Sequence, residues 1–274
     1  MSARSVTAAF EKARSEGRVP LVGYLPAGFP DVEGSIEALT VMAEAGCDVI
    51  EVGLPYTDPV MDGPVIQAAA QQALEAGVRT DDVFRVVEAV AATGTPTLVM
   101  TYWNPVERYG VERFAERLAD AGGAGLITPD LTPDFAPEWS EAADRHGLDK
   151  VFLVAPSSTD ERIALTTAAS RGFVYATAVM GVTGGTPVGD LAQPLVQRAQ
   201  AATDLPVCVG VGVSTREQAA SVAGYADGVI VGSAFVRVLL DHADDRSAAL
   251  TALRGLTEDL AAGVREAAAA VPAQ

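Results

Sequence analysis

The sequence contains few of the residues that form disulfides or bind metal ions. Its two cysteines, Cys47 and Cys208, have no CxxC spacing, and its two histidines, His146 and His242, have no other plausible ligand nearby in the sequence. This usage argues against a disulfide framework and against a structural zinc site. We therefore interpret both cysteines as buried structural thiols and expect no metal.

Positive charge is scarce as well. The chain has 19 Lys and Arg against 36 Asp and Glu, which gives a formal net charge of −17 and a pI of about 4.4. Such a surface repels nucleic acid and anionic lipid, so we predict neither a nucleic-acid partner nor a membrane partner. Any phosphate ligand must be bound by groups gathered locally.

Long hydrophobic runs are absent too. No apolar run approaches the roughly 20 residues of a membrane-spanning helix, and the first residues, MSARSVTAAFEKARSEGR, lack the apolar segment of a signal peptide. With 49% hydrophobic and 20% charged residues, the composition is typical of a globular protein with a substantial core. We expect a cytoplasmic protein whose N-terminal segment is an ordinary helix.

What the sequence does contain is a repeated alternation of short apolar runs and helical patterns. The runs are rich in Val, Ile and Leu, as in parallel strands buried on both faces. They cover residues 20–25, 48–52, 96–101, 125–128, 150–155, 173–177, 206–210 and 227–232. Glycines such as Gly46, Gly122 and Gly147 end the helical stretches just before the strands. Without a linker-like stretch, this pattern predicts an α/β fold, a single (β/α)8 TIM-barrel domain over residues 1–274 with an extra N-terminal helix. A doubly wound open sheet is the alternative.

The stretch VIEVGLPYTDPVMDGP, residues 49–64, places Glu51 inside one of these apolar strands. Alternation puts Glu51 on the side opposite Ile50 and Val52, and we expect it to face the barrel interior near the C-terminal mouth. Burial there raises a carboxyl pKa and suits the group to proton transfer. The alternative is a structural carboxylate that accepts backbone hydrogen bonds.

Two more acids, Asp58 and Asp62, lie on the proline- and glycine-rich loop that follows. Asp58 suits a turn or an interface. Asp62 precedes Gly-Pro and a helical pattern, so it is either a helix N-cap or a second acid directed back over the barrel. The spacing permits two carboxylates, Glu51 and Asp62, at one ligand.

Glycines gather after the later strands. The segment GVTGG, residues 181–185, resembles a loop that closes over a substrate. Gly210, Gly212, Gly232 and Ser233 follow the seventh and eighth strands, where backbone amides and the start of a helix can bind a phosphate without lysine or arginine. The alternative is a set of tight turns.

Aromatic residues at the strand tips either line a ligand pocket or pack in the core. They are Tyr24, Tyr102, Trp103, Phe173 and Tyr175. By alternation Phe173 and Tyr175 share a face, with Tyr175 nearer the mouth.

These motifs together resemble one family, the tryptophan synthase α subunit. The resemblance covers nearly the whole chain, through YLPAGFPD (24–31), DVIEVGLPYTDPVMDGP (48–64), LVMTYWNPVERYG (98–110), GFVYATAVMGVTGG (172–185) and ADGVIVGSAFV (226–236). The segment E-x-G-x-P-Y-T-D-P-x-x-D-G-P is its most specific part.

The resemblance implies a lyase that splits indole-3-glycerol phosphate into indole and glyceraldehyde 3-phosphate by a retro-aldol route. Glu51 would move the protons, and Asp62 would hold the indole N–H. Tyr102, Tyr175, Thr183, Gly184, Gly212, Gly232 and Ser233 would bind the substrate.

The resemblance further implies a partner. Pro55, Asp58, Asn104 and Asp130 would face a tryptophan synthase β subunit in an αββα heterotetramer. The α chain itself would carry no cofactor, and pyridoxal phosphate would belong to the β partner. A free-standing lyase and a catalytically idle phosphate-binding barrel are the alternatives.

Overall fold

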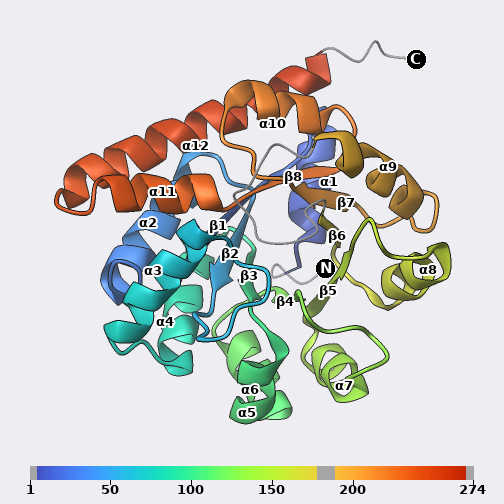
Figure 1. Cartoon of the computed structure of the whole chain (residues 1–274), viewed down its shortest axis with the longest axis horizontal. Helices are drawn as coiled ribbons and strands as arrows, with labels where there is room; N and C mark the ends of the chain where they lie inside the picture. Colours follow the sequence, from blue (N-terminus) through green and yellow to red (C-terminus); the bar gives the residue numbers. More distant parts are fainter. Residues whose placement is uncertain (1–4, 178–188, 270–274) are drawn as a thin grey trace.

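The computed structural model describes residues 5–177 and 189–269, and it forms a closed barrel of eight parallel strands in chain order (Figure 1). Each strand coincides with one of the predicted apolar runs to within one residue at either end. The strands are β1 (Leu21–Pro26), β2 (Val49–Gly53), β3 (Thr97–Met100), β4 (Gly125–Thr128), β5 (Asp149–Val154), β6 (Val174–Thr177), β7 (Val207–Gly210) and β8 (Gly228–Val231). The predicted TIM barrel is therefore confirmed, and the open-sheet alternative is wrong.

Helices ring the barrel, one or two in each connection. The outer ring consists of α2 (Val32–Ala45), α4 (Thr80–Ala91), α6 (Val111–Asp120), α7 (Pro137–His146), α8 (Asp160–Ala169), α9 (Gly189–Gln200), α10 (Arg216–Ala223) and α12 (Arg246–Ala269). The predicted N-terminal helix is α1 (Thr7–Ser15), and three further helices precede ring helices: α3 (Pro64–Glu75), α5 (Trp103–Tyr109) and α11 (Ser233–Asp241). The sequence pattern did not predict α5 as a separate helix, because it is only 7 residues long.

The strands alternate between a barrel-facing side and a helix-facing side, as a parallel barrel requires. Inward side chains such as Val22, Val49 and Leu98 form a core cluster separate from the larger one between strands and helices. The inward set also includes Phe173 and Tyr175, which confirms that these two aromatics share a face. Only one side of each strand is therefore available to build a site at the barrel mouth.

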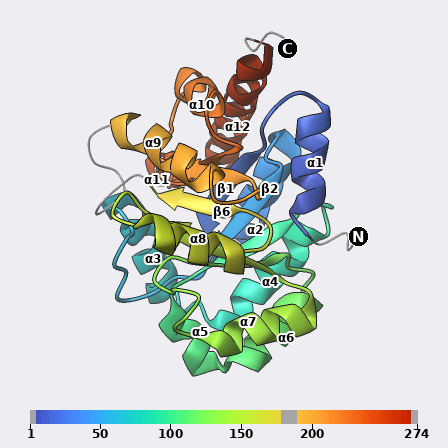
Figure 2. The ribbon, with the colours of Figure 1, turned by 90° about the vertical axis from the view of Figure 1, so that its right-hand side faces the viewer.

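Helix α1 closes the floor of the barrel, at the end where the strands begin (Figure 2). Its Phe10 stacks on Phe173, with ring centroids 5.7 Å apart. Phe173 is fully buried there, so it is a floor residue and not part of a ligand pocket.

A buried carboxylate fastens this helix to the barrel. Asp149, at the start of β5, accepts hydrogen bonds from the backbone N–H of Val6 at 3.0 Å and from the Ser5 hydroxyl at 3.1 Å. The Arg171 guanidinium lies 3.4 Å from the same carboxylate. These bonds offset the cost of burying the charge and hold the N-terminal segment under the strands.

Helix ends follow the predicted glycine pattern at most positions. Gly147 ends α7 in the left-handed region with φ of 70°, a conformation that favours glycine. Gly224 ends α10 with φ of −71°, so its backbone does not require glycine.

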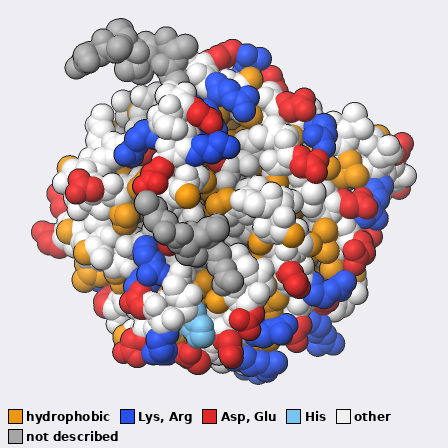
Figure 3. All heavy atoms as spheres, turned by 180° about the vertical axis from the view of Figure 1, so that it is seen from behind, with side chains coloured by type: hydrophobic (Ala, Val, Ile, Leu, Met, Phe, Trp, Pro, Cys, Tyr) orange, Lys and Arg blue, Asp and Glu red, His pale blue; other side chains and the backbone are white. Residues whose placement is uncertain are grey.

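The helices and one face of the molecule bear on the predictions about membranes and nucleic acid. No helix of the described part of the chain is long and apolar enough to cross a membrane. On the face opposite the mouth, acidic and basic side chains are intermixed (Figure 3). The visible face thus has no continuous basic surface.

Candidate active site

Glu51 enters the barrel from β2 as predicted. It is the register partner of Tyr24 on β1, and its side chain is fully buried. Neither carboxylate oxygen has a hydrogen-bond partner among the described residues. Burial raises the pKa of Glu51 to about 8, because the apolar barrel disfavours the charged form. A buried carboxyl without partners is costly to a fold, which favours a catalytic over a structural interpretation.

Asp62 lies at the end of the loop after β2. The N-cap of α3 is Gly63, and no side chain caps that helix, so the N-cap interpretation of Asp62 is wrong. Its carboxylate instead accepts a hydrogen bond from the Tyr102 hydroxyl at 2.9 Å. Burial raises the pKa of Asp62, and the hydrogen bond from Tyr102 partly opposes that shift.

Two tyrosines lie close to the acids, and Tyr24 is buried whereas Tyr175 is half-buried. Burial raises the pKa of the Tyr24 hydroxyl well above its usual range, and the charges of Asp62 and Glu51 add to the shift. Burial likewise raises the pKa of Tyr175, with Glu51 as the next contribution. Both carboxyl groups therefore act on the hydroxyl of Tyr24, which places them around one region at the barrel mouth.

Glycines at the strand ends make room for these rings. A Cβ atom added at Gly53 would overlap the hydroxyl of Tyr24, and one added at Gly210 would overlap the hydroxyl of Tyr175. A Cβ at Gly232 would lie 3.3 Å from the Tyr24 ring. The sequence interpretation of glycines 210 and 232 as bare amides or turns missed this role.

The predicted phosphate-binding residues lie at the ends of β7 and β8. Gly212 follows β7 with φ of 75° and has open space where a side chain would be, whereas Gly232 is the N-cap of α11 and Ser233 is its first residue. A helix thus begins at Ser233, as predicted. Thr183 and Gly184, from the predicted closing loop, lie outside the described residues.

The residues expected to face a partner lie in the connections after β2, β3 and β4, with Asn104 in α5 and the others on loops. The Asn104 amide donates to the Tyr56 hydroxyl at 3.0 Å, and the Asp130 carboxylate accepts from the backbone N–H of Trp103 at 2.9 Å. Asp58 is exposed and accepts from Thr57, and Pro55 is buried. Sequence reasoning missed Tyr56, whose only signal is its place between Pro55 and Asp58.

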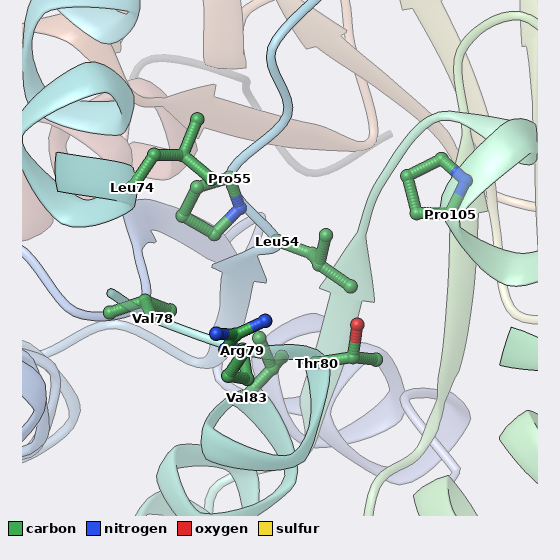
Figure 4. Close-up of a pocket in the computed structure, with 8 residues that line it drawn as sticks. All are labelled: Leu54, Pro55, Leu74, Val78, Arg79, Thr80, Val83 and Pro105. Carbon is green, nitrogen blue, oxygen red and sulfur yellow. The ribbon is translucent and has the colours of Figure 1, made fainter. Parts of the chain in front are cut away.

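Pro55 also lines a cavity of about 210 Å³ on the outside of the barrel (Figure 4). Leu54, Leu74, Val78 and Pro105 contribute to its apolar wall, and Arg79 and Thr80 are its polar residues. The cavity contains neither Glu51 nor Asp62, so it is separate from the two acids.

Neither the cysteines nor the metal-ligating residue types of the described chain offer a second candidate for catalysis. Both cysteines are buried and free, and burial raises the pKa of each thiol. Among the described residues, no group of three or more His, Cys, Asp or Glu side chains is placed to hold a metal ion. The two acids at the mouth remain the best candidates for catalysis.

Comparisons with known proteins agree with the motifs. A family model described as tryptophan synthase alpha chain matches residues 10–265. The tryptophan synthase alpha chain of Salinispora arenicola is 63% identical over 258 residues, which cover 94% of this chain and 96% of that one. The protein of the same description from Mycobacterium avium is 58% identical over 262 residues, covering 95% of this chain and 94% of that one.

Solved structures give the same result. A structure of Mycobacterium tuberculosis tryptophan synthase has a TM-score of 0.90 at 55% identity and covers 95% of this chain and 98% of that one. A mutant tryptophan synthase alpha subunit from Pyrococcus furiosus has a TM-score of 0.81 at 34% identity and covers 89% of this chain and 98% of that one. The chain belongs to the tryptophan synthase alpha chain family.

Proposed function

We propose that this chain cleaves indole-3-glycerol phosphate to indole and glyceraldehyde 3-phosphate in tryptophan biosynthesis, as the α subunit of tryptophan synthase. Membership of the family supports this activity. The single structural observation that carries it is Glu51, a fully buried carboxyl group with no partner among the described residues at the mouth of a barrel. A group in that state can both give and take a proton near neutral pH.

Glu51 supplies the acid and then the base. With a pKa of about 8 it is protonated in the free protein at pH 7. It gives its proton to C3 of the indole ring, which produces a cationic indolenine. The resulting carboxylate then takes the proton of the glycerol hydroxyl as the carbon–carbon bond breaks. The bonding electrons return to the ring, so indole and an aldehyde form and Glu51 is again protonated.

Asp62 acts in the opposite charge state. The hydrogen bond from Tyr102 favours its ionised form. As a carboxylate it accepts the indole N–H and stabilises the positive charge that protonation of C3 creates. Two carboxyl groups in different environments thus perform different tasks.

The phosphate group binds at the late strands. The backbone N–H groups after β7 and at the start of α11 bind the anion without a lysine or arginine. Gly184, Gly212, Gly232 and Ser233 contribute these groups, and Thr183 belongs to the closing loop. Thr183 and Gly184 lie outside the described residues. Tyr175 contacts the substrate from β6. Backbone N–H groups supply positive potential locally, so a phosphate can bind although the protein carries a net charge of −17.

A tryptophan synthase β subunit is the partner, in an αββα heterotetramer that receives the indole directly. The α reaction needs no cofactor, and the pyridoxal phosphate belongs to the β subunit. Pro55, Asp58, Asn104 and Asp130 form the partner face. Two large apolar side chains on the same loops support this placement, since Val60 is 68% exposed and Phe135 is 73% exposed. As a biosynthetic enzyme, the protein acts in the cytoplasm.

One assay tests the proposal. The purified chain is incubated with indole-3-glycerol phosphate, with and without a tryptophan synthase β subunit, and indole is measured. We expect slow release by the chain alone and strong stimulation by the β subunit. Full turnover without stimulation would support a free-standing lyase, and no release under either condition would support an idle barrel.

A further inference from the structure

A continuous chain of contacts joins the partner face to Asp62. It begins at Asn104 in α5, whose side-chain amide donates to the Tyr56 hydroxyl at 3.0 Å. Asn104 is exposed and Tyr56 is half-buried, so this hydrogen bond is accessible to a protein that docks on the loops after β2 and β3.

The second contact is between two aromatic rings. Tyr56 lies against Tyr102 with ring centroids 5.5 Å apart and an interplanar angle of 37°. Tyr102 is 5% exposed, so this contact joins a residue at the surface to one in the interior. A shift of the Tyr56 ring must be accommodated by Tyr102, because a buried ring has little free space around it.

The third contact fixes the second acid. The Tyr102 hydroxyl gives its single proton to Asp62 at 2.9 Å and accepts from the backbone N–H of Met61 at 3.0 Å. One hydroxyl therefore holds both the carboxylate of Asp62 and the backbone immediately before it. This pair of bonds orients the carboxylate more strictly than a single bond would.

The backbone next to Tyr102 is also held by a hydrogen bond. Asp130, on the loop after β4, accepts from the backbone N–H of Trp103 with both oxygens, at 2.9 and 3.1 Å. Tyr102 is the N-cap of α5, the helix that also carries Asn104. Asp130, a second residue expected to face the partner, thus holds the peptide group that joins Tyr102 to Trp103.

We infer that Tyr102 is a positioning residue for Asp62, and that the contacts Asn104–Tyr56–Tyr102–Asp62 transmit docking of the β subunit to the orientation of the Asp62 carboxylate. The inference rests on the proposed function. It adds a route by which the partner stimulates the α reaction, and it gives Tyr102 a role beyond contact with the substrate.

The test compares three variants of the full chain, each assayed for indole release alone and with saturating β subunit. Tyr102→Phe removes the hydroxyl that holds Asp62. Tyr56→Phe keeps the ring contact but removes the bond from Asn104. Tyr109→Phe is the control, because Tyr109 ends the same helix and its hydroxyl donates to the exposed Asp81, away from the two acids.

We expect Tyr102→Phe to lower kcat about tenfold with less than a twofold change in KM, as for the loss of one hydrogen bond to a charged group. It should also move the acid limb of the pH profile to higher pH, because the Asp62 carboxylate loses a donor. Tyr56→Phe should reduce the stimulation by the β subunit at least threefold, and Tyr109→Phe should behave as wild type.

Two outcomes would overturn the inference. The first is a Tyr102→Phe variant with wild-type kcat and an unmoved acid limb. The second is a Tyr56→Phe variant whose stimulation returns to the wild-type value once the β subunit is saturating, because Tyr56 would then contribute only to affinity. Failure of the proposed function is distinguishable, since the wild-type chain itself would then release no indole or show no stimulation.

Discussion

Glu51 and Tyr24 are register partners on adjacent parallel strands, so their side chains enter the barrel at the same level. Tyr24 is the neighbour of Glu51 on β1, and the glycines at positions 53 and 232 leave the space that the Tyr24 ring occupies. The arrangement removes Glu51 from water while leaving it without a hydrogen-bond partner among the described residues. The raised pKa of Glu51 therefore follows from packing and not from a neighbouring charge.

The two acids predict a bell-shaped pH dependence of kcat/KM for indole release. The reaction begins with protonated Glu51, so activity should fall as the pH rises through about 8. It also needs ionised Asp62, whose pKa is raised by burial, so activity should fall on the acid side as that carboxylate becomes protonated. Rates measured from about pH 4 to about pH 10 check both limbs. A profile still rising above about pH 9 would contradict the assignment of Glu51 as the acid.

The same group predicts how stability varies with pH. In the folded chain Glu51 keeps its proton up to about pH 8, whereas the unfolded chain loses it near 4.5. The folded state binds more protons between these values, so this group lowers the free energy of unfolding as the pH rises, by at most about 1.4 kcal/mol per pH unit. Glu51→Gln should remove this loss, so the variant gains stability over wild type between about pH 5 and about pH 8. Urea titrations at about pH 5 and about pH 8 measure this gain. A difference in stability between Glu51→Gln and wild type that is equal at the two pH values would contradict the prediction.

A side chain added at Gly53 should collide with Tyr24 at the barrel mouth. Gly53→Ala would place a methyl group against the Tyr24 hydroxyl, so we expect a loss of about 1–3 kcal/mol in the free energy of unfolding and reduced activity. Gly255→Ala is the matched control, because Gly255 lies exposed in α12 with nothing within 4 Å of an added Cβ. That change should stabilise the chain by about 1 kcal/mol. If both variants unfold at the same urea concentration, the close approach of Tyr24 to Gly53 is not needed for stability.

Substitutions at the floor of the barrel should change the stability of the protein but not its catalytic rate. Asp149→Ala leaves the Val6 N–H and the Ser5 hydroxyl without their acceptor, so we expect a loss of about 2–3 kcal/mol. Asp144→Ala removes an exposed carboxylate 2.8 Å from Lys150 and should cost less than about 1 kcal/mol. Both variants should keep the wild-type kcat below their unfolding temperatures. A lower kcat for Asp149→Ala under those conditions would mean that the floor affects the mouth.

Much of this structure could be predicted from the sequence, because the determining signals are local. The apolar runs indicate all eight strands, and the alternation around Glu51 indicates its inward direction, since successive residues of a strand face opposite sides. The start of α11 at Ser233 is also predictable, from the strand and glycine that precede it.

Other features depend on contacts between distant segments. Nothing near Gly210 or Gly232 in the sequence indicates that each makes room for a tyrosine from a different strand. The contact between Tyr56 and Tyr102 depends on the path of a proline-rich loop, which composition does not specify. The resemblance implies only that Tyr102 binds the substrate. The hydrogen bond from its hydroxyl to Asp62 is known only once the segments after β2 and β3 are placed together.

Indole release by Glu51→Gln is the decisive measurement of proton transfer by Glu51. The variant keeps the size of the side chain but can neither give nor take a proton at the reacting carbon. With indole-3-glycerol phosphate and saturating β subunit, we predict that it binds substrate with wild-type affinity and releases no measurable indole. Release at a rate near that of wild type would contradict the account.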